Sequence, residues 1–509
     1  MNLIKSTSTF SFFTIISRLL GYLRDILIAI FLGVGPITDA FFVAFRIPNT
    51  FRRLFSEGTF NAAFVPSYSS ELSKTKKRAS NFANNIFNLL IIGLFLIVLL
   101  IEIFMPFFVS LIAPGFDEGS PKMELAINLT RITFPFLFFI CLSSFFSAVL
   151  NSHNKFAAAA AVPIILNIFL IGVLLFGKIL DDQLVYYMSY AVTFSGILQF
   201  IFLYFFLKKY YLPKIKFKIN IDSKVKIFFK KLLPSIFSSG VTQINILVGT
   251  IIATFQSNAV SYLYYADRIY QINLAIAGIA IGTVVLPQLS KHIQNKKKSS
   301  INLIQNKALE LSLFLSIPAT VALLIASEEI VSALFGYGSF SEIGVQNTAL
   351  AVFYFAIGLP SFSLNKLFST FFFARHDTKT PFYIGVITVV LNIIISISFF
   401  NSVGFIIIPI ASSISAWINA ILLFVILKKD DLFSFNTAFV NRFIRIIFSV
   451  ISMGIFFNFL VNFFRNFLVY DESSKFLYLI MIVLLGFIFY LVIAILIKAF
   501  KISDIKLKY

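Results

Sequence analysis

Charged residues are scarce in this chain of 509 residues, where Asp, Glu, Lys and Arg together make up 13%. A soluble domain usually carries about 25%. Hydrophobic residues make up 59%, and the mean hydropathy is +0.93. The low charge excludes an ordinary soluble protein. The apolar runs are long and do not alternate every second residue, so they indicate membrane helices and exclude a membrane barrel.

Several kinds of catalytic and metal-binding motif are missing. Cys141 is the single cysteine, so neither a disulfide framework nor a cysteine metal site can form within the chain. There is no P-loop, GxSxG, HExxH or CxxC motif, and the three histidines, His153, His292 and His376, fall in connections that we expect to lie in the cytoplasm. We therefore expect no metal, no cofactor and no ATP-driven step. Any transport across a membrane by this chain would then be driven by an ion gradient, the membrane potential or the substrate's own gradient.

Long apolar stretches dominate the sequence, and a membrane span needs about 20 such residues. The candidate spans are residues 8–33, 39–66, 85–112, 124–150, 156–177, 184–207, 231–256, 259–288, 310–336, 345–374, 380–400, 405–428, 440–463 and 475–499. No small-residue cleavage site precedes the first charged cluster, so we expect the first span to stay in the membrane. The predicted fold is an all-α polytopic membrane protein with about fourteen transmembrane helices.

The connections between these spans alternate in charge. The basic ones are KTKKR (74–78), the segment 208–231, KHIQNKKK (291–298), ARHDTK (374–379), KKDD with the later Arg442 and Arg445, and the C-terminal KAFKISDIKLKY. The others are short or acidic, such as APGFDEGSP and VYDESS. The positive-inside rule places the basic connections and both termini in the cytoplasm. The net charge of +20 then reflects topology, and we expect no nucleic-acid partner.

Two parts of the chain resemble each other at an offset of 225 residues. Residues 134–168 and 359–393 align so that Pro135 meets Pro360 and Asn167 meets Asn392. AFRI (44–47) and ADRI (266–269) are a second pair at a similar offset. The alternative is chance similarity in a sequence of low diversity. A repeat shifted by six helices keeps its orientation, which predicts two six-helix lobes related by a pseudo-two-fold axis along the membrane normal.

The predicted organisation follows from this repeat. It comprises an N-terminal lobe (1–207), a basic cytoplasmic linker (208–230), a C-terminal lobe (231–428) and two extra helices (429–509). The linker is either a hinge between the lobes or a surface helix on anionic lipid, and one segment could be both. A substrate site would lie between the lobes, near the membrane midplane.

Spans one, two and eight hold charges where lipid would otherwise be expected. A charge at the bilayer centre costs about 2.5–3.5 kcal/mol, so these side chains must face one another, water or a ligand. The group comprises Arg18, Arg24, Arg46, Arg52, Arg53 and Arg268 with Asp25, Asp39, Glu57 and Asp267, and Asn49 lies among them. One interpretation is interhelical salt bridging with snorkelling at the span ends, as for Arg53 and Glu57, four residues apart. The other is an anion site in a water-filled cavity.

The excess of arginine favours a phosphate ligand. A guanidinium group stays charged and donates two parallel hydrogen bonds, so arginines from several helices suit a diphosphate. Arg18 and Arg24 are about 240° apart around a helix, and they point in different directions unless Gly21 allows a bend. Asp25 can pair with either arginine. Arg24 is the stronger candidate for phosphate, and Arg18 is the one with a partly structural role.

Four motifs stand out together: SRLLGYLRD (17–25), the block DAFFVAFRIPNTFRRLFSEGTFNAAFVPSYS (39–69), LTRITFPF (129–136) and YYADRIYQ (264–271). They resemble the MurJ (MviN) family of lipid II flippases, in the multidrug/oligosaccharidyl-lipid/polysaccharide exporter superfamily. The similarity extends over essentially the whole chain. It implies a substrate, the undecaprenyl-diphosphate-linked disaccharide-pentapeptide precursor of peptidoglycan.

The resemblance also implies roles for particular residues. Cavity arginines of that family match Arg18, Arg24, Arg52 and Arg268, and positions of functional weight match Asp39, Asn49 and Ser261. We add Asp25 and Asp267, the acids next to two of these arginines, to the supporting set. The two extra helices match a pair that forms a groove for the lipid tail. Some members carry an acid in span seven as part of a sodium site. Gly249 stands there in this chain although Asn392 remains, so we expect no sodium site of that kind.

The leading hypothesis is a non-enzymatic flippase of the bacterial inner membrane that works by alternating access. Its expected partners are the lipid-linked precursor, membrane lipids and the cell-wall synthesis machinery. One alternative is a related exporter of another polyprenyl-linked oligosaccharide or of drugs. Another is a membrane enzyme acting on a polyprenyl diphosphate, which would need a convergent acid/base or metal site.

Overall fold

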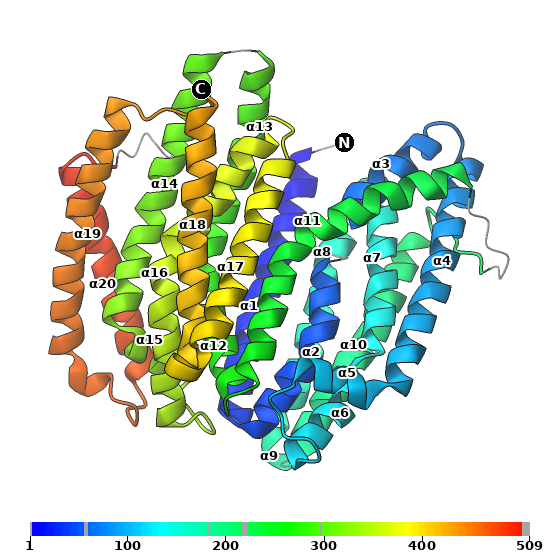
Figure 1. Cartoon of the computed structure of the whole chain (residues 1–509), viewed down its shortest axis with the longest axis horizontal. Helices are drawn as coiled ribbons and strands as arrows, with labels where there is room; N and C mark the ends of the chain where they lie inside the picture. Colours follow the sequence, from blue (N-terminus) through cyan, green and yellow to red (C-terminus); the bar gives the residue numbers. More distant parts are fainter. Residues whose placement is uncertain (1–2, 55–59, 181–182, 216–221, 296, 501–509) are drawn as a thin grey trace. The chain divides into compact units, whose positions relative to one another are not determined.

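The computed structural model describes residues 3–54, 60–180, 183–215, 222–295 and 297–500, and these residues form helices and their connections, without strands (Figure 1). The chain divides into two compact units, Met1–Ser261 and Tyr262–Tyr509. The predicted all-α fold is therefore confirmed for the described residues. The lobe boundaries and the pseudo-two-fold axis stay predictions.

The first unit consists of helices joined by short connections. They are α1 (Leu3–Leu32), α2 (Pro36–Leu54), α3 (Phe60–Leu72), α4 (Lys76–Ile103), α5 (Met105–Ile112), α6 (Pro121–Thr133), α7 (Phe136–Ser152), α8 (Phe156–Leu175), α9 (Gly177–Leu180), α10 (Leu184–Leu207) and α11 (Ser223–Ala253). The start of α6 carries the signals typical of a helix N-terminus, since the Ser120 hydroxyl accepts from the Met123 amide and Pro121 follows it. Helix α8 packs against both α1 and α10, and α2 packs against α6.

The second unit is also helical. Its elements are α12 (Ala259–Leu274, whose first three residues belong to the first unit), the π-helical turn η3 (Ala275–Ala280), α13 (Ile281–Gln294), α14 (Lys298–Ile325), α15 (Ser327–Phe335), α16 (Glu342–Phe373), α17 (Lys379–Val403), η4 (Gly404–Ile406), α18 (Ile407–Lys429), α19 (Thr437–Phe463), η5 (Arg465–Phe467) and α20 (Lys475–Leu496). Helix α16 packs against α14 and α18, and α19 packs against α14 and α20.

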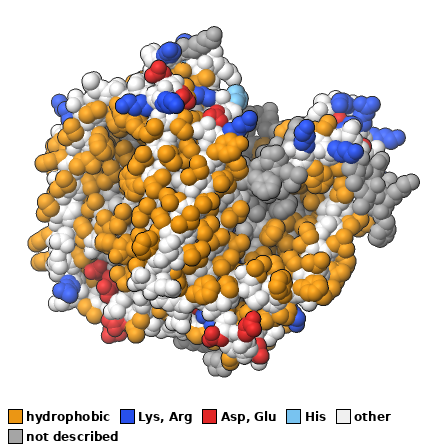
Figure 2. Space-filling view, in the orientation of Figure 1, with side chains coloured by type: hydrophobic (Ala, Val, Ile, Leu, Met, Phe, Trp, Pro, Cys, Tyr) orange, Lys and Arg blue, Asp and Glu red, His pale blue; other side chains and the backbone are white. Residues whose placement is uncertain are grey.

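The chain is a multi-pass membrane protein. Ten helical stretches among the described residues are long and apolar enough to cross a membrane. Each of the predicted spans overlaps one to three described helical elements, but the number of crossings stays a prediction. Hydrophobic side chains cover the visible helix faces of both units in Figure 2, while Lys, Arg, Asp and Glu gather at helix ends.

Four helices end in the same type of turn. In each turn a residue other than glycine adopts a left-handed conformation, and the next amide donates back to the carbonyl five residues earlier. The left-handed residues are Asn154, His376, Asp431 and Lys498, with φ between 51° and 62°. All four lie in connections that the sequence predicts to be cytoplasmic. The turns at Asn154 and His376 lie in the two aligned segments of the predicted repeat, 134–168 and 359–393.

Candidate functional site

Arg24 and Asp25 form a buried ion pair on α1, with exposed fractions of only 8% and 2%. The Asp25 carboxylate accepts from Arg24 Nη2 at 2.7 Å and from Arg24 Nε at 3.0 Å. Arg24 Nη1 also donates to Asn167 Oδ1 on α8, at 3.0 Å. Asn167 Nδ2 in turn donates to the Ser17 carbonyl, which ties α8 to α1. The structure thus pairs Asp25 with Arg24 and gives that arginine a second partner on another helix.

Arg18 lies one and a half turns earlier on α1 and is exposed. The two arginines therefore differ in environment, as their separation around the helix predicts. α1 is continuous through Gly21, where an added Cβ would meet Asn167 Nδ2 at 3.8 Å, an ordinary contact. A bend at Gly21 is not needed to account for this arrangement.

The polar residues of α2 form a local network. Asn49 is buried, and its Oδ1 accepts from Arg52 Nε at 3.0 Å. Pro48 lies inside the helix just before them, where its missing amide and ring interrupt the regular hydrogen bonding. Glu57, the predicted partner of Arg53, lies outside the described residues.

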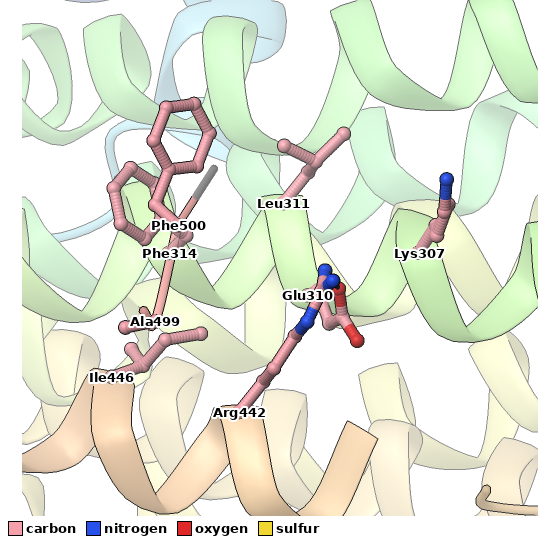
Figure 3. A pocket seen from close by; sticks show the side chains of 8 residues that line it. All are labelled: Lys307, Glu310, Leu311, Phe314, Arg442, Ile446, Ala499 and Phe500. Atoms are coloured by element: carbon pink, nitrogen blue, oxygen red, sulfur yellow. Dashed lines mark hydrogen bonds and ion pairs between the residues drawn. The ribbon is translucent and has the colours of Figure 1, made fainter. Parts of the chain in front are cut away.

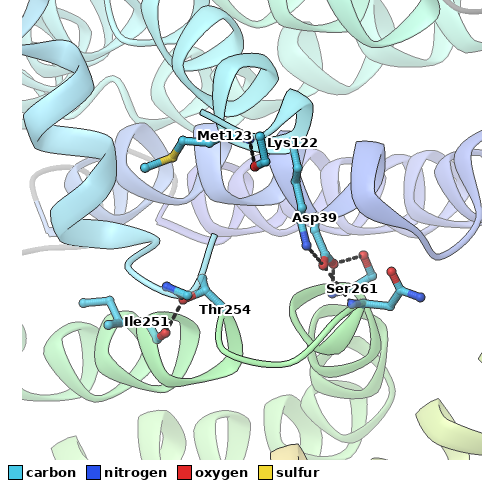
Figure 4. A network of polar contacts seen from close by, with 9 residues as sticks. Asp39, Lys122, Met123, Ile251, Thr254 and Ser261 are labelled. Atoms are coloured by element: carbon cyan, nitrogen blue, oxygen red, sulfur yellow. Dashed lines mark hydrogen bonds and ion pairs between the residues drawn. The ribbon is translucent and has the colours of Figure 1, made fainter. Parts of the chain in front are cut away.

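Asp39 is the centre of a network at the start of α2, and it is completely buried (Figure 4). Its Oδ2 accepts from Lys122 Nζ at 2.8 Å and from the Asn258 amide at 3.0 Å. Its Oδ1 accepts from the Ser261 amide at 2.9 Å and from the Ser261 hydroxyl at 2.5 Å. Since α12 begins at Ala259, Asp39 supplies from another helix the acceptor that a capping side chain normally provides.

A second contact supports the same end of the first unit. Gly115 donates its amide to Thr254 Oγ1 at 3.1 Å, beside the connection that leads into α12 (Figure 4). A Cβ on Gly115 would lie 2.3 Å from the Phe255 amide nitrogen. No side chain fits there, so this close approach requires glycine.

Asp267 and Arg268 lie side by side in sequence on α12 and have separate partners within that helix. Gln271 Nε2 donates to Asp267 Oδ2. Arg268 Nη2 donates to the Tyr264 hydroxyl at 3.0 Å, and its guanidinium carbon lies 4.6 Å from the centre of the Tyr264 ring. The Tyr264 side chain thus orients Arg268 by a hydrogen bond and a cation–π contact.

Asn392, the remaining polar residue of the sodium site considered above, joins a hydrogen-bonded cluster of α17 and α18. It donates to Ser412 Oγ at 3.3 Å and accepts from Ser396 Oγ at 3.1 Å. Over the part of the chain that the structure describes, no cluster of three or more His, Cys, Asp or Glu side chains could hold a metal ion.

The structure thus brings together Arg24 with Asp25, Asn49 with Arg52, and Asp39 with Ser261. Arg268 and Asp267 lie in the second unit, where they are described by themselves. Sequence reasoning missed two partners. Asn167 appeared only as a repeat position, although a buried amide in an apolar helix is itself a signal. Nothing in the sequence indicates that Lys122 is a partner of Asp39, because it resembles an ordinary lysine of a polar connection.

Comparisons with known proteins establish the family. The family model for lipid II flippase MurJ matches residues 28–479. A probable lipid II flippase MurJ of Rickettsia prowazekii is 38% identical over 426 residues, covering 83% of each chain. The corresponding protein of Buchnera aphidicola subsp. Schizaphis graminum is 32% identical and covers 97% of this chain and 96% of its own.

Solved structures agree. The structure of a lipid II flippase MurJ in an inward-closed conformation matches with a TM-score of 0.81 and 27% identity, over 96% of this chain and 98% of its own. An inward-facing MATE family transporter of the MOP superfamily matches with a TM-score of 0.67 over 81% of this chain and 94% of its own, and its 15% identity supports the fold alone. By model, relatives and fold, this chain belongs to the lipid II flippase MurJ family.

Proposed function

We propose that the protein flips the undecaprenyl-diphosphate-linked peptidoglycan precursor, lipid II, from the cytoplasmic to the outer leaflet of the bacterial inner membrane. Family membership over nearly the whole chain is the observation that carries this proposal. The protein acts as a transporter and not as an enzyme. Its lobes, 1–207 and 231–428, alternate in access, with both termini in the cytoplasm.

The substrate diphosphate binds Arg18, Arg24, Arg52 and Arg268. Guanidinium groups suit this ligand because they remain charged and donate paired hydrogen bonds. The hydrogen bonds from Arg52 to Asn49 and from Arg268 to Tyr264 support a role for these neighbours in orienting the guanidinium groups. Asp39 acts indirectly, through the start of the helix that carries Arg268.

The polyprenyl tail stays in lipid beside α19 and α20 while the headgroup crosses. An arginine-rich cavity also responds to the membrane potential, at about 2.3 kcal/mol per charge per 100 mV. An inside-negative potential favours return of the empty positive cavity toward the cytoplasm. The cell-wall synthesis machinery, which consumes the product, is the candidate protein partner.

Complementation tests the proposal. In a bacterium depleted of its own flippase, Arg24→Ala and Arg268→Ala each abolish growth while protein abundance stays normal. Lys209→Ala, which removes an exposed cation, serves as the matched control and supports growth. Normal growth with both arginine variants would refute the diphosphate site. If the Arg24→Ala protein instead failed to accumulate in the cell, the role of Arg24 would be that of a structural ion pair.

The same depleted strain distinguishes a lipid II flippase from a related exporter with a different cargo. That cargo would be another polyprenyl-linked oligosaccharide or a drug. Depletion of a lipid II flippase causes lysis and accumulation of the lipid-linked peptidoglycan precursor. Expression of this chain reverses both effects. Survival with a normal precursor level after depletion would favour the other cargo.

A further inference from the structure

Two charged side chains within the membrane-spanning helices of the first unit lie outside the proposed substrate site. Glu102 is the next-to-last residue of α4, and Arg131 is on α6, in the motif LTRITFPF. Glu102 is half-buried, and its Oε1 is buried without a hydrogen-bond partner among the described residues. A charge inside a membrane helix is costly, and such residues usually serve in substrate, ion or proton pathways.

Chain geometry places Glu102 and Arg131 at the same depth in the membrane. α5 and α6 pack against each other and are joined by the short connection 113–120. Glu102 lies ten residues before the end of α5 at Ile112, and Arg131 lies ten residues after the start of α6 at Pro121. At 1.5 Å per residue each is about 15 Å from this connection, near the middle of a hydrocarbon core of about 30 Å. The charge of Arg131 accordingly acts on Glu102.

Both charges stand beside a break in their helix. α4 gives way to α5 at Phe104, and Pro106 follows. α6 gives way to α7 at Phe134 and Pro135. The rings of Phe108 and Phe134 meet edge to face with their centres 5.6 Å apart, so the two breaks lie next to each other. Breaks at proline are positions where a membrane helix can bend.

The other charged side chains of the helices around α4 lie at its opposite end. α3, α5, α7 and α11 pack against α4, and α5 and α7 carry no Asp, Glu, Lys or Arg. Glu71 near the end of α3 accepts from Lys224 at the start of α11 at 2.6 Å, and the other lysines of α11 follow in its first turns. The start of α4, which holds its basic residues, is 26 residues or about 39 Å from Glu102. The titratable groups on these helices that are neutral at ordinary pH are Tyr68 and Cys141.

A partly buried acid in the second unit shows the alternative arrangement. Glu310 on α14 accepts from Arg442 on α19 at 2.9 Å (Figure 3). An ion pair of this kind favours the charged form of both groups. Glu102 Oε1 has no such bond, and a buried carboxyl group without a partner is more stable with a bound proton than as an anion.

We propose that Glu102 is a proton-binding site inside the membrane, with Arg131 as the partner of its ionised form. The protonated carboxyl group is neutral and stays apart from Arg131. When the proton leaves to water, the carboxylate pairs with the guanidinium group. The pair then ties the break between α4 and α5 to the break between α6 and α7. The site takes a proton and controls bending within the first unit, so it does not depend on the cargo of the proposed flippase.

Infrared difference spectroscopy of the purified full-length chain tests the site. Acidification produces the high-frequency carbonyl band of a carboxylic acid in apolar surroundings. The band is missing in Glu102→Gln and is retained in Glu102→Asp, which keeps the carboxyl group. Arg131→Gln moves the midpoint of this titration up by about 1–3 pH units, because it removes the cation that favours the anion. The matched control Glu124→Gln, which removes an exposed acid of α6, leaves the band and its midpoint unchanged.

Cys141 reports on the breaks, because this single cysteine lies on α7 and is only 1% exposed. Its reaction with a membrane-permeant maleimide requires a local opening. In a buffer in which Glu102 is ionised, Glu102→Gln is labelled faster than the unaltered chain, while Glu124→Gln is labelled at the unaltered rate. In acidic buffer the difference disappears, since Glu102 is then neutral in both chains.

Three results would overturn the proposal. They are a carboxylic acid band that survives Glu102→Gln, a midpoint that Arg131→Gln does not move, and equal labelling of Glu102→Gln and the unaltered chain in both buffers. Size-exclusion profiles identical to that of the unaltered chain show that each variant is folded.

Discussion

Asp39→Asn is a near-isosteric change that separates the two halves of the Asp39 network. The amide oxygen can still accept from the Ser261 amide and hydroxyl at the Oδ1 position. The amide nitrogen would replace Oδ2, which accepts from Lys122 Nζ and from the Asn258 amide. A nitrogen donor cannot accept from either group, so two partly buried donors lose their acceptor.

The structure sets the magnitude of this change. A hydrogen bond to a charged acceptor contributes about 1.5–3 kcal/mol, so two such bonds are worth about 3–6 kcal/mol. Lys122 is 19% exposed at its side chain, which leaves part of its charge solvated and favours the lower end of this range. Ser261→Ala removes one hydroxyl donor to the same carboxylate and keeps the amide bond, so it costs about 1.5–3 kcal/mol, the value of a single such bond.

Thermal unfolding of the purified variants in one detergent measures the effect. Asp39→Asn lowers the unfolding midpoint more than Ser261→Ala does. Adding Lys122→Met to Asp39→Asn recovers part of the loss, because it removes the ammonium group that has no anion partner. If the two substitutions were additive, or if Asp39→Asn matched the surface control Lys209→Gln, the reasoning about a buried network would be refuted.

Three further outcomes are expected. Lys475→Met destabilises the second unit in thermal unfolding, because this buried ammonium donates to two backbone carbonyls and lies 4.3 and 4.7 Å from two tyrosine ring centres. A hydrogen bond from Lys224, and a weaker contribution from the one from Lys74, lower the pKa of Glu71. The stabilising contribution of Glu71 is therefore present above its ordinary pKa and is lost as pH falls through the lowered value. Glu71→Gln removes that part of the acid sensitivity of unfolding. Glu310→Gln lowers the unfolding midpoint, and Arg442→Met added to it restores part of the loss, because the pair is largely shielded from solvent.

The sequence predicted the class of structure well because membrane insertion imposes it locally. About 20 apolar residues between polar connections specify a helix wherever they occur, since a bilayer leaves no other partner for backbone groups. Helix ends were less predictable. The turn at Lys498 places a lysine in a left-handed conformation that favours Asn, Asp or Gly, so no residue preference marks it.

The partner of Asp25 illustrates what periodicity cannot decide. A spacing of seven residues places Arg18 and Asp25 on one face, yet Asp25 binds the adjacent Arg24. Neighbouring residues are about 100° apart on a helix, and an arginine is long enough to reach back across that angle. The choice depends on which face of α1 packs against α8. An apolar helix has no polar face, so its sequence does not reveal which side packs against a neighbouring helix.

The network of Asp39 was beyond the sequence for a different reason. In the sequence, Lys122 lies 83 positions after Asp39, and Ser261 lies 222 positions after it. No sequence motif links these three positions to one another. Each has an unremarkable local role: an acid in the first turn of α2, a lysine in the first turn of α6 and a serine near the start of α12. Only the packing of three helix starts turns them into one buried site.

The two arginines of α1 differ in what an incoming anion would encounter. Arg24 shares its charge with Asp25 and has a further bond to Asn167, so the buried pair as a whole is close to neutral. A diphosphate that binds Arg24 must compete with a carboxylate at 2.7 Å, whereas the side chain of Arg18 is exposed. Such competition matters for a transporter, because a ligand that replaces an internal partner is held less tightly and can be released. The ion pair is therefore compatible with a substrate-binding role for Arg24, provided that Asp25 takes the arginine back when the substrate leaves.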